Sequence, residues 1–270
     1  MTTTLTPPQH QLQQQPQPQD HSRTHVVTTV LADIRDTIMP DRTGRHGPLP
    51  PVLVSMTLVT GLVDAFSYLL LGHVFVANMT GNIVFLGFAL AGARGFSVAA
   101  SLVAIGAFAV GALLGGRLGA RFRGHRGRLH SRAGAAQAAF LAVSVILAIV
   151  GGVLAADYRY ALIVVLGIAM GIQNATARKI AIPDLTTTVL TLTVTGIAAD
   201  SSLAGGAGSK IGRRLVSVVT MLVGALIGAT LILHAPTFIP LALALATVIA
   251  GAVISHLLGR SNPSWVGTGR

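Results

Sequence analysis

The chain has 270 residues, of which 52% are hydrophobic and only 10% are charged, and its formal net charge is +11. Because soluble domains carry about 25% charged residues, this balance excludes an ordinary soluble protein and predicts a membrane protein. Cysteine is absent, which excludes disulfides and thiol catalysis. Positive charge collects in the cytoplasmic loops of membrane proteins, so we expect anionic lipid headgroups as its partner and no nucleic acid.

The first 50 residues are predicted to form a cytoplasmic tail. Residues 1–20 are rich in Gln, Pro and Thr and contain no apolar run, so we expect them to be disordered. Apolar residues recur at helical spacing over residues 25–39, which predicts a short helix that ends at Pro40. The tail lacks the basic-then-apolar layout of a signal peptide, so no cleavage is expected.

Eight apolar elements follow in a membrane domain over residues 51–259, before a short cytoplasmic tail at 260–270. They lie at 52–72, 75–92, 97–116 and 133–155 in the first half, and at 160–177, 184–203, 215–233 and 238–258 in the second. A helix needs roughly 17–25 mostly apolar residues to cross a bilayer. We predict that the first, third and fourth elements of each half cross, which gives an all-α fold with six transmembrane helices.

The second element of each half is interrupted by polar residues, at 78–82 in the first half and at 184–188 in the second. Lipid cannot hydrogen-bond a bare backbone, so polar, non-helical chain at membrane depth must be buried in protein or line a wet cavity. Broken segments at matching places in two halves point to the central site of a transporter. We therefore predict two broken, re-entrant elements that contribute to one site.

The distribution of arginines favours this arrangement over eight crossings. Six of them lie between the third and fourth elements, namely Arg117, Arg121, Arg123, Arg126, Arg128 and Arg132. Eight crossings from a cytoplasmic N-terminus would place this loop outside. With two re-entrant elements, all of the 19 Lys and Arg except Arg94 and Arg159 face the cytoplasm, as the positive-inside rule requires. We predict a bacterial inner-membrane protein with both termini in the cytoplasm.

Three crossings in each half give the halves opposite orientations, which is the pattern of an inverted repeat over residues 52–155 and 160–258. Residues 61–65 align with 171–175, and residues 78–80 then meet 184–186 after a short gap. Glycines four residues apart occur at corresponding places, Gly111 and Gly115 in one half and Gly224 and Gly228 in the other. Such faces let helices approach closely. We expect them to pack the two third elements together or to join protomers of a homo-oligomer.

These residues carry a family resemblance. The runs TGLVDAFS at 60–67 and GHVFVANMTGN at 72–82, with GIQNA at 171–175 and PDLTTTVLT at 183–191, resemble the signatures of the YoaK-like family of multi-pass bacterial inner-membrane proteins. The resemblance extends over about residues 53–258 and departs from the family pattern at Leu192, where a glycine is expected. It implies a multi-pass inner-membrane protein and supplies no activity, so the expected mechanism rests on physical chemistry.

Asp64 is the strongest candidate for a functional residue, because it lies near the middle of the first predicted crossing. A charged side chain there costs about 2.5–3.5 kcal/mol on insertion scales, and such residues face a cavity or a partner and suggest ion or proton coupling. The alternative is a structural acid that is hydrogen-bonded to a neighbouring helix break. The candidate pathway also includes the polar residues at and near the breaks: Asn78, Thr80, Asn82, Gln173, Asn174, Asp184, Thr186, Thr187 and Thr188.

The Asn and Thr residues of the two breaks are natural N-caps, and the free N–H groups of a helix start attract anions. No Gly-x-Ser-x-Gly elbow, zinc-type His/Glu cluster or Walker phosphate loop occurs, so we expect neither an enzyme nor a cofactor or metal. The predicted function is proton- or cation-coupled secondary transport of a small polar or anionic solute. A channel, a non-transporting scaffold and an intramembrane enzyme remain alternatives.

Overall fold

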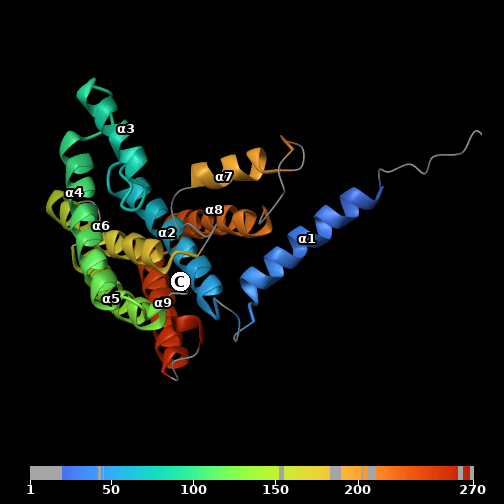
Figure 1. The fold of residues 1–270 in the computed structure, drawn as a ribbon. Coiled ribbons are helices and arrows are strands. Elements are labelled where there is room, and N and C mark those ends of the chain that lie inside the picture. Colours follow the sequence, from blue (N-terminus) through green and yellow to red (C-terminus); the bar gives the residue numbers. More distant parts are fainter. Residues whose placement is uncertain are drawn as a thin grey trace, which may run out of the picture.

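The structure is a computed structural model, and it describes residues 20–41, 44, 46–151, 155–182, 190–201, 204–205, 211–260 and 264–267. Every regular element among these residues is helical (Figure 1). The helices are α1 (Asp20–Ile38), α2 (Leu49–Leu70), α3 (Met79–Leu90), α4 (Val98–Arg121), α5 (Arg126–Val150), α6 (Ala156–Ile180), α7 (Leu190–Ala199), α8 (Ile211–His234) and α9 (Ile239–Gly259), followed by the 3-10 turn η2 (Ser264–Val266).

Six of these helices, α2, α4, α5, α6, α8 and α9, are long and apolar enough to cross a membrane. This finding confirms the predicted all-helical membrane fold. The apolar windows of α2 and α6 are mostly buried within the bundle, whereas the other four helices expose most of theirs. Helices that are apolar all round and still exposed are suited to lipid rather than to water. The bundle therefore has two central helices with four peripheral ones around them.

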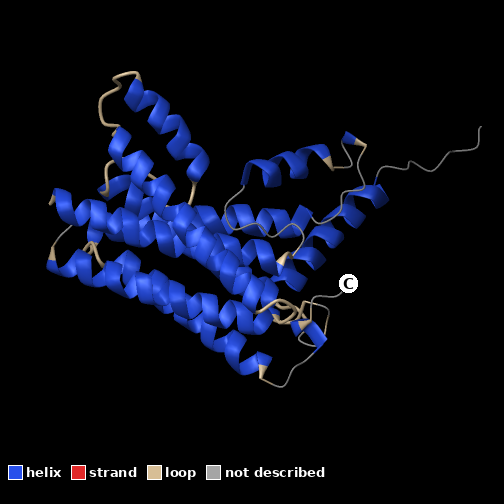
Figure 2. Cartoon of the chain, turned by 60° about the vertical axis from the view of Figure 1, so that its left-hand side comes forward, coloured by secondary structure: helices blue, strands red, loops and turns tan. Residues whose placement is uncertain are grey.

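The long helices associate in pairs that join the two halves of the sequence. Helix α2 packs mainly on α8, α4 packs on α6, and α5 packs on α9. The central helices are also flanked symmetrically, because α2 contacts α9 while α6 contacts α5. The two short helices instead pack within their own halves at equivalent places, α3 against α4 and α7 against α8. Figure 2 shows α3 and α7 on the same side of the bundle, with their inner ends facing each other.

Helices α3 and α7, with 12 and 10 residues, are too short to cross a hydrocarbon core that needs about 20. They correspond to the interrupted elements at 75–92 and 184–203. Helix α3 begins at Met79, so most of the predicted break at 78–82 is helical, and residues 183–189 before α7 lie outside the described residues. Their re-entrant path through the bilayer stays a prediction.

The basic segment between α4 and α5 is more helical than the apolar pattern indicated. Only residues 122–125 separate the two helices, so most of the six arginines lie on helix ends rather than in a loop. Arginine is a good helix former, and its long side chain reaches water from a helix end. The His125 side chain caps α5 by accepting a hydrogen bond from the Arg128 N–H at 3.1 Å. Apolar counting therefore found the lipid-facing part of these helices and missed their basic ends.

The predicted helix at 25–39 is observed as α1, which begins earlier, at Asp20, and packs on α8. The expected disorder of residues 1–20 falls almost entirely outside the described residues.

At one end of the bundle, an apolar cluster gathers the starts of α2 and α5 with the ends of α4, α6 and α9. Trp265 of η2 is buried in this cluster, with its ring against Gly47 and Gly127. Gly47 has a φ of +47°, and a Cβ there would collide with the indole. The arginine-rich helix ends thus lie together around this buried apolar cluster.

Candidate functional site

The chain between α2 and α3 is a non-helical loop over residues 71–78. The break was predicted at 78–82, but residues 79–82 form the first turn of α3 and only Asn78 lies in the loop. Gly72 and His73 have φ values of +89° and +56°, which turns the chain out of α2. The His73 N–H donates to the Tyr68 carbonyl at 3.2 Å, and its ring Nδ1 lies 3.0 Å from the Gly95 carbonyl oxygen. His73 is exposed and lies at the outer edge of the loop, so it is not part of the buried site.

Asp64 anchors this loop from the middle of α2. Its Oδ1 accepts hydrogen bonds from the backbone N–H groups of Val76, at 3.2 Å, and Ala77, at 2.9 Å. The side chain is buried, and its Oδ2 has no hydrogen-bond partner among the described residues. An acceptor at this position satisfies two amides that would otherwise be buried without a partner. Asp64 therefore has a structural task, which was the alternative weighed from the sequence, and it retains one unpartnered oxygen.

Asn82 holds the same loop from the side of α3. Its Oδ1 accepts from the Phe75 N–H at 2.9 Å, and its Nδ2 donates to the Phe75 carbonyl at 2.5 Å. The amide thus imitates the paired hydrogen bonds of a neighbouring strand, while being fully buried. Asn78 occupies the N-cap position of α3 but makes no side-chain capping bond there. The loop is clamped between two buried polar side chains, one from each flanking helix.

A cavity of about 330 Å³ lies where α3 and α7 begin. It is lined by the end of the loop and the first turn of α3, by the first turn of α7, and by one residue each from α4 and α8: Ala77, Asn78, Met79, Thr80, Gly81, Leu190, Thr191, Phe108 and Met221. Both short helices therefore direct their N-terminal ends at one space, and the partial positive charge of a helix start favours an anion or a polar oxygen there.

The predicted site residues fall into three groups in relation to this cavity. Asn78 and Thr80 line it. Asp64 and Asn82 lie behind its wall and hold the loop that forms it. The residues of the second break, Asp184, Thr186, Thr187 and Thr188, lie outside the described residues. The structure adds Thr191, Phe108 and Met221 to the lining.

Gln173 lies elsewhere, in a polar network between the two central helices and α5. Its Oε1 accepts from the Gln137 Nε2 at 2.7 Å, and its own Nε2 donates to the Thr60 Oγ1 at 2.8 Å and the Met56 carbonyl at 3.1 Å. Thr60 stands one helical turn before Asp64 on α2, so the network reaches the residue that anchors the loop. Gln137 was not singled out from the sequence, because its partner is 36 residues away and no spacing reveals the pair.

The network approaches a second polar group, His130, which is buried on α5. His130, Ser55 and Gln137 line a cavity of only about 10 Å³, which is close to the smallest space that holds one water molecule. The His130 Nδ1 has no hydrogen-bond partner within the described part of the chain. The polar side chains thus extend from the basic end of α5 through the bundle centre to Asp64.

Asn174, which the predicted repeat aligns with Asp64, donates to the Met170 carbonyl of its own helix at 2.9 Å and is half-buried. The part of the chain that would correspond to the anchored loop, residues 183–189, is outside the described residues.

The predicted packing glycines lie at two close helix crossings with matching contacts. A Cβ at Gly61 would collide with the Met221 carbonyl near Gly224, and a Cβ at Gly171 with the Phe108 carbonyl near Gly111. Gly115 and Gly228 repeat the pattern against the carbonyls of Ile172 and Leu62: a Cβ would approach these to 2.9 and 3.1 Å. The glycines of α4 therefore pack on α6 and those of α8 on α2, rather than on each other or across protomers as expected.

Among the described residues, no group of three or more His, Asp or Glu side chains could hold a metal ion.

Comparison with known proteins gives one family and one curated relative. Residues 52–256 match a family model described as "Protein of unknown function (DUF1275)". The chain is 34% identical over 156 residues to the UPF0700 transmembrane protein YoaK of Bacillus subtilis (strain 168), a match that covers 56% of this chain and 66% of that protein. No solved structure matches the chain significantly.

Proposed function

The chain belongs to the membrane-protein family described as "Protein of unknown function (DUF1275)", and we propose that it is a secondary transporter. The solute would be small and polar or anionic, and its movement would be coupled to a proton or cation. The cavity of about 330 Å³ between the starts of α3 and α7 carries this proposal. Two helix N-termini that converge on one space beside an interrupted crossing are typical of transporter binding sites.

The lining of the cavity supports a small ligand with hydrogen-bonding oxygens. Thr80 and Thr191 supply hydroxyls from the first turns of α3 and α7, and Asn78 supplies an amide. Phe108 and Met221 supply an apolar wall from the two flanking helices. A few polar groups on an apolar surface are the usual make-up of a small-molecule site. Among the described residues, none of those that line the cavity is acidic, so an anion meets no opposing charge from them.

Asp64 is proposed to couple the solute to a proton or cation through the loop rather than by direct contact. Its charged form accepts hydrogen bonds from the amides of Val76 and Ala77, and Ala77 lines the cavity. Neutralising the carboxylate weakens charge-assisted bonds of this kind. A change of charge on Asp64 would therefore loosen the wall of the cavity, and the unpartnered Oδ2 offers a place for the proton.

The halves are proposed to form an inverted repeat. Two matching contacts support this arrangement: Gly61 of α2 packs on the backbone of α8, and Gly171 of α6 packs on the backbone of α4. In each case a central helix of one half pairs with a helix of the other half. Each crossing brings backbones together without intervening side chains and so makes a rigid helix pair. Alternating access would then take the form of one pair, α2 with α8, rocking against the other, α4 with α6.

The basic helix ends support an orientation with both termini in the cytoplasm of a bacterial cell. Arg121, Arg128 and Arg260 lie at the α4, α5 and α9 ends that meet around the apolar cluster. Cytoplasmic loops of membrane proteins carry an excess of arginine and lysine. Because the chain contains no cysteine, single cysteines can map this topology directly. With impermeant thiol reagents, Arg123→Cys should react only from inside and Ala93→Cys only from outside, whereas eight crossings would reverse both.

Flux measurements in liposomes that contain a pH-sensitive dye test the transport proposal. The purified protein should move protons only when a transported member of a panel of small anions and polar metabolites is present. Thr80→Phe fills the cavity and should abolish this flux, whereas Ile83→Phe, at an exposed position of the same helix, should leave it intact. A leak that needs no solute would indicate a channel. Silence of folded wild-type protein across the panel, or equal flux in both variants, would refute the proposal.

A further inference from the structure

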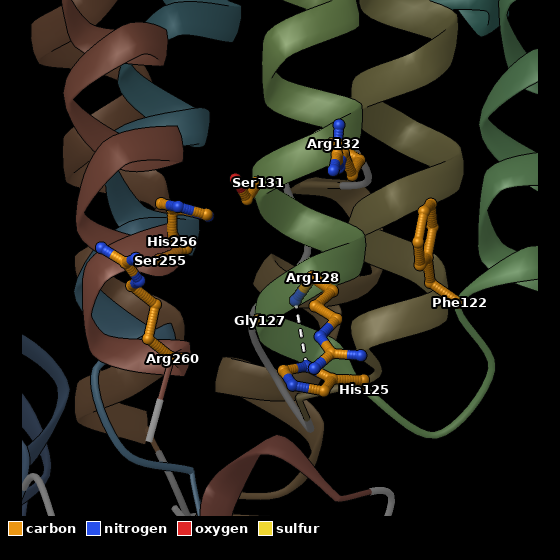
Figure 3. Close-up of a pocket in the computed structure, with 10 residues that line it drawn as sticks. Phe122, His125, Gly127, Arg128, Ser131, Arg132, Ser255, His256 and Arg260 are labelled. Atoms are coloured by element: carbon orange, nitrogen blue, oxygen red, sulfur yellow. Dashed lines mark hydrogen bonds between the residues drawn. The ribbon is translucent and has the colours of Figure 1, made fainter. Parts of the chain in front are cut away.

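A second cavity, of about 430 Å³, lies at the basic end of the bundle between the start of α5 and the end of α9 (Figure 3). Its basic lining comes from both helices: Arg128 and Arg132 with His125 from α5 and its cap, and Arg260 with His256 from α9 and its cap. The three arginines carry the charge, because the His125 Nδ1 accepts a hydrogen bond from the Arg128 N–H. None of its lining residues is acidic. Helix α5 also begins here, so the positive end of its dipole adds to the side-chain charge.

The three arginines of this cavity are available to a ligand. Arg128, Arg132 and Arg260 are exposed, and within the described residues none of their guanidinium groups forms an ion pair with a carboxylate. Figure 3 shows Arg128 and Arg132 on successive turns of α5, with Arg260 on the facing helix. In Figure 3 the guanidinium of Arg260 is turned away from α5, so this exposed side chain would rotate toward the cavity on binding. Guanidinium groups from two helices could then bind different oxygens of one tetrahedral anion, often through two parallel hydrogen bonds each.

Ser255 provides an independent sign that the cavity takes a polar ligand. Its side chain is fully buried, it lines the cavity, and its Oγ has no hydrogen-bond partner among the described residues. A buried hydroxyl without a partner is unfavourable by roughly 1–3 kcal/mol, and a ligand oxygen in the cavity would satisfy it. The cavity thus combines a buried neutral donor with three exposed arginines.

We propose that this cavity binds a phosphate group, carried either by an anionic phospholipid or by a soluble phosphate compound. The charge and shape of the lining suit a phosphate, and about 430 Å³ is enough for a phosphodiester headgroup. The cavity lies at the ends of two membrane-length helices, α5 and α9, and basic pockets between transmembrane helices on the cytoplasmic side are typical sites for phospholipid headgroups. This site is separate from the cavity at the α3 and α7 starts and does not depend on transport.

The protein contains a natural reporter for this binding. Trp265 is the only tryptophan in the chain, it is 2% exposed, and its ring stands 3.1 Å from the position of a Cβ on Gly127, which lines the cavity. Purified protein in phosphatidylcholine nanodiscs would be titrated with cardiolipin, with phosphatidylglycerol and with inorganic phosphate while the fluorescence of Trp265 is followed. Native mass spectrometry on the same samples would count retained lipid molecules.

The informative variant replaces Arg128, Arg132 and Arg260 with glutamine. Its matched control replaces Arg117, Arg121 and Arg178, which are exposed, lie at the ends of α4 and α6 in the same region and do not line the cavity. Both variants lose three positive charges. The cavity variant should bind the anionic probe at least about tenfold more weakly, since one lost charge-assisted bond accounts for a factor of that size. The control should stay within about twofold, because exposed distant charges are screened by salt.

Ser131→Asp places a negative charge at the half-buried edge of the cavity without removing an arginine, and it should weaken binding in the same direction. A response to the lipids alone would identify a headgroup, and competition by inorganic phosphate would identify a soluble source. Equal loss in both triple variants would mean general attraction to the basic end, and no saturable binding by folded wild-type protein would mean no site. Either of these two results would overturn the proposal.

Discussion

Substitutions of Asp64 separate the anchoring of the loop from any role in coupling. Asp64→Ala removes the acceptor of two buried amides, on Val76 and Ala77. Each buried N–H left without a partner costs about 1–3 kcal/mol, so the free energy of unfolding should fall by roughly 2–6 kcal/mol. Asp64→Asn keeps an oxygen at nearly the same place and volume. It loses only the extra strength of charge-assisted bonds, and the loss should be about 1–2 kcal/mol.

The assay is unfolding of the protein in mixed micelles by increasing denaturing detergent, followed through the fluorescence of Trp265. Thr57→Ala is the matched control, because Thr57 is also buried on α2 but donates only to the Leu53 carbonyl of its own helix. It should cost no more than about 1 kcal/mol. Equal stability of the Ala and Asn variants of Asp64 would refute the anchor. An Asn variant that folds and still couples proton flux to solute would refute the coupling role while leaving the anchor intact.

Three further tests probe the packing and the hydrogen bonds around the site. Gly61→Ala should destabilise the protein by about 1–3 kcal/mol, because the new methyl group meets the backbone of α8. Gly106→Ala on α4 is its control: the space around this glycine is open, so the change should be neutral or stabilising. Thermal unfolding compares the two variants. Gln137→Leu should cost about 1–3 kcal/mol by leaving the Gln173 Oε1 without its donor, and a double-mutant cycle with Gln173→Leu should show that the two effects are not additive. Asn82→Asp replaces the donor to a loop carbonyl by an acceptor and should speed hydrogen exchange of the loop amides while leaving α9 unaffected.

The six crossing helices could be predicted from the sequence because lipid imposes a long apolar run on each of them, whatever its neighbours are. Their ends could not be placed in the same way. Helix α5 begins seven residues before the predicted element, at Arg126, since a helix continues beyond the lipid wherever its residues favour helix and reach water. His130 was hidden for this reason, because it falls in a segment that was interpreted as a basic loop.

Asp64 and, in the first break, Asn82 could also be found, since polar residues stand out in apolar surroundings. Their partners could not be predicted, because Asp64 binds amides 12 and 13 residues away through a loop whose shape depends on Gly72 and His73. Local spacing predicts contacts within a helix, at three or four residues. It carries no information on a carboxylate that turns toward a folded-back chain. A hydrogen bond from a helix break to Asp64 was therefore only the alternative, and capping was expected of Asn82, which anchors backbone instead.

The exchange of partners between the halves explains why a single cavity draws on both of them. Because α2 packs on α8 and α6 on α4, neither half encloses its own central helix, and a half alone would expose the glycine faces that need a partner backbone. The two resulting helix pairs meet where Gln173 of α6 hydrogen-bonds Thr60 and Met56 of α2. If each pair moves as a rigid body, the hydrogen bonds of this buried amide must shift or exchange. Its partner Thr60 lies one turn before Asp64, which holds the cavity wall. A movement of one pair against the other would then be coupled to a change in the hydrogen bonds of Asp64.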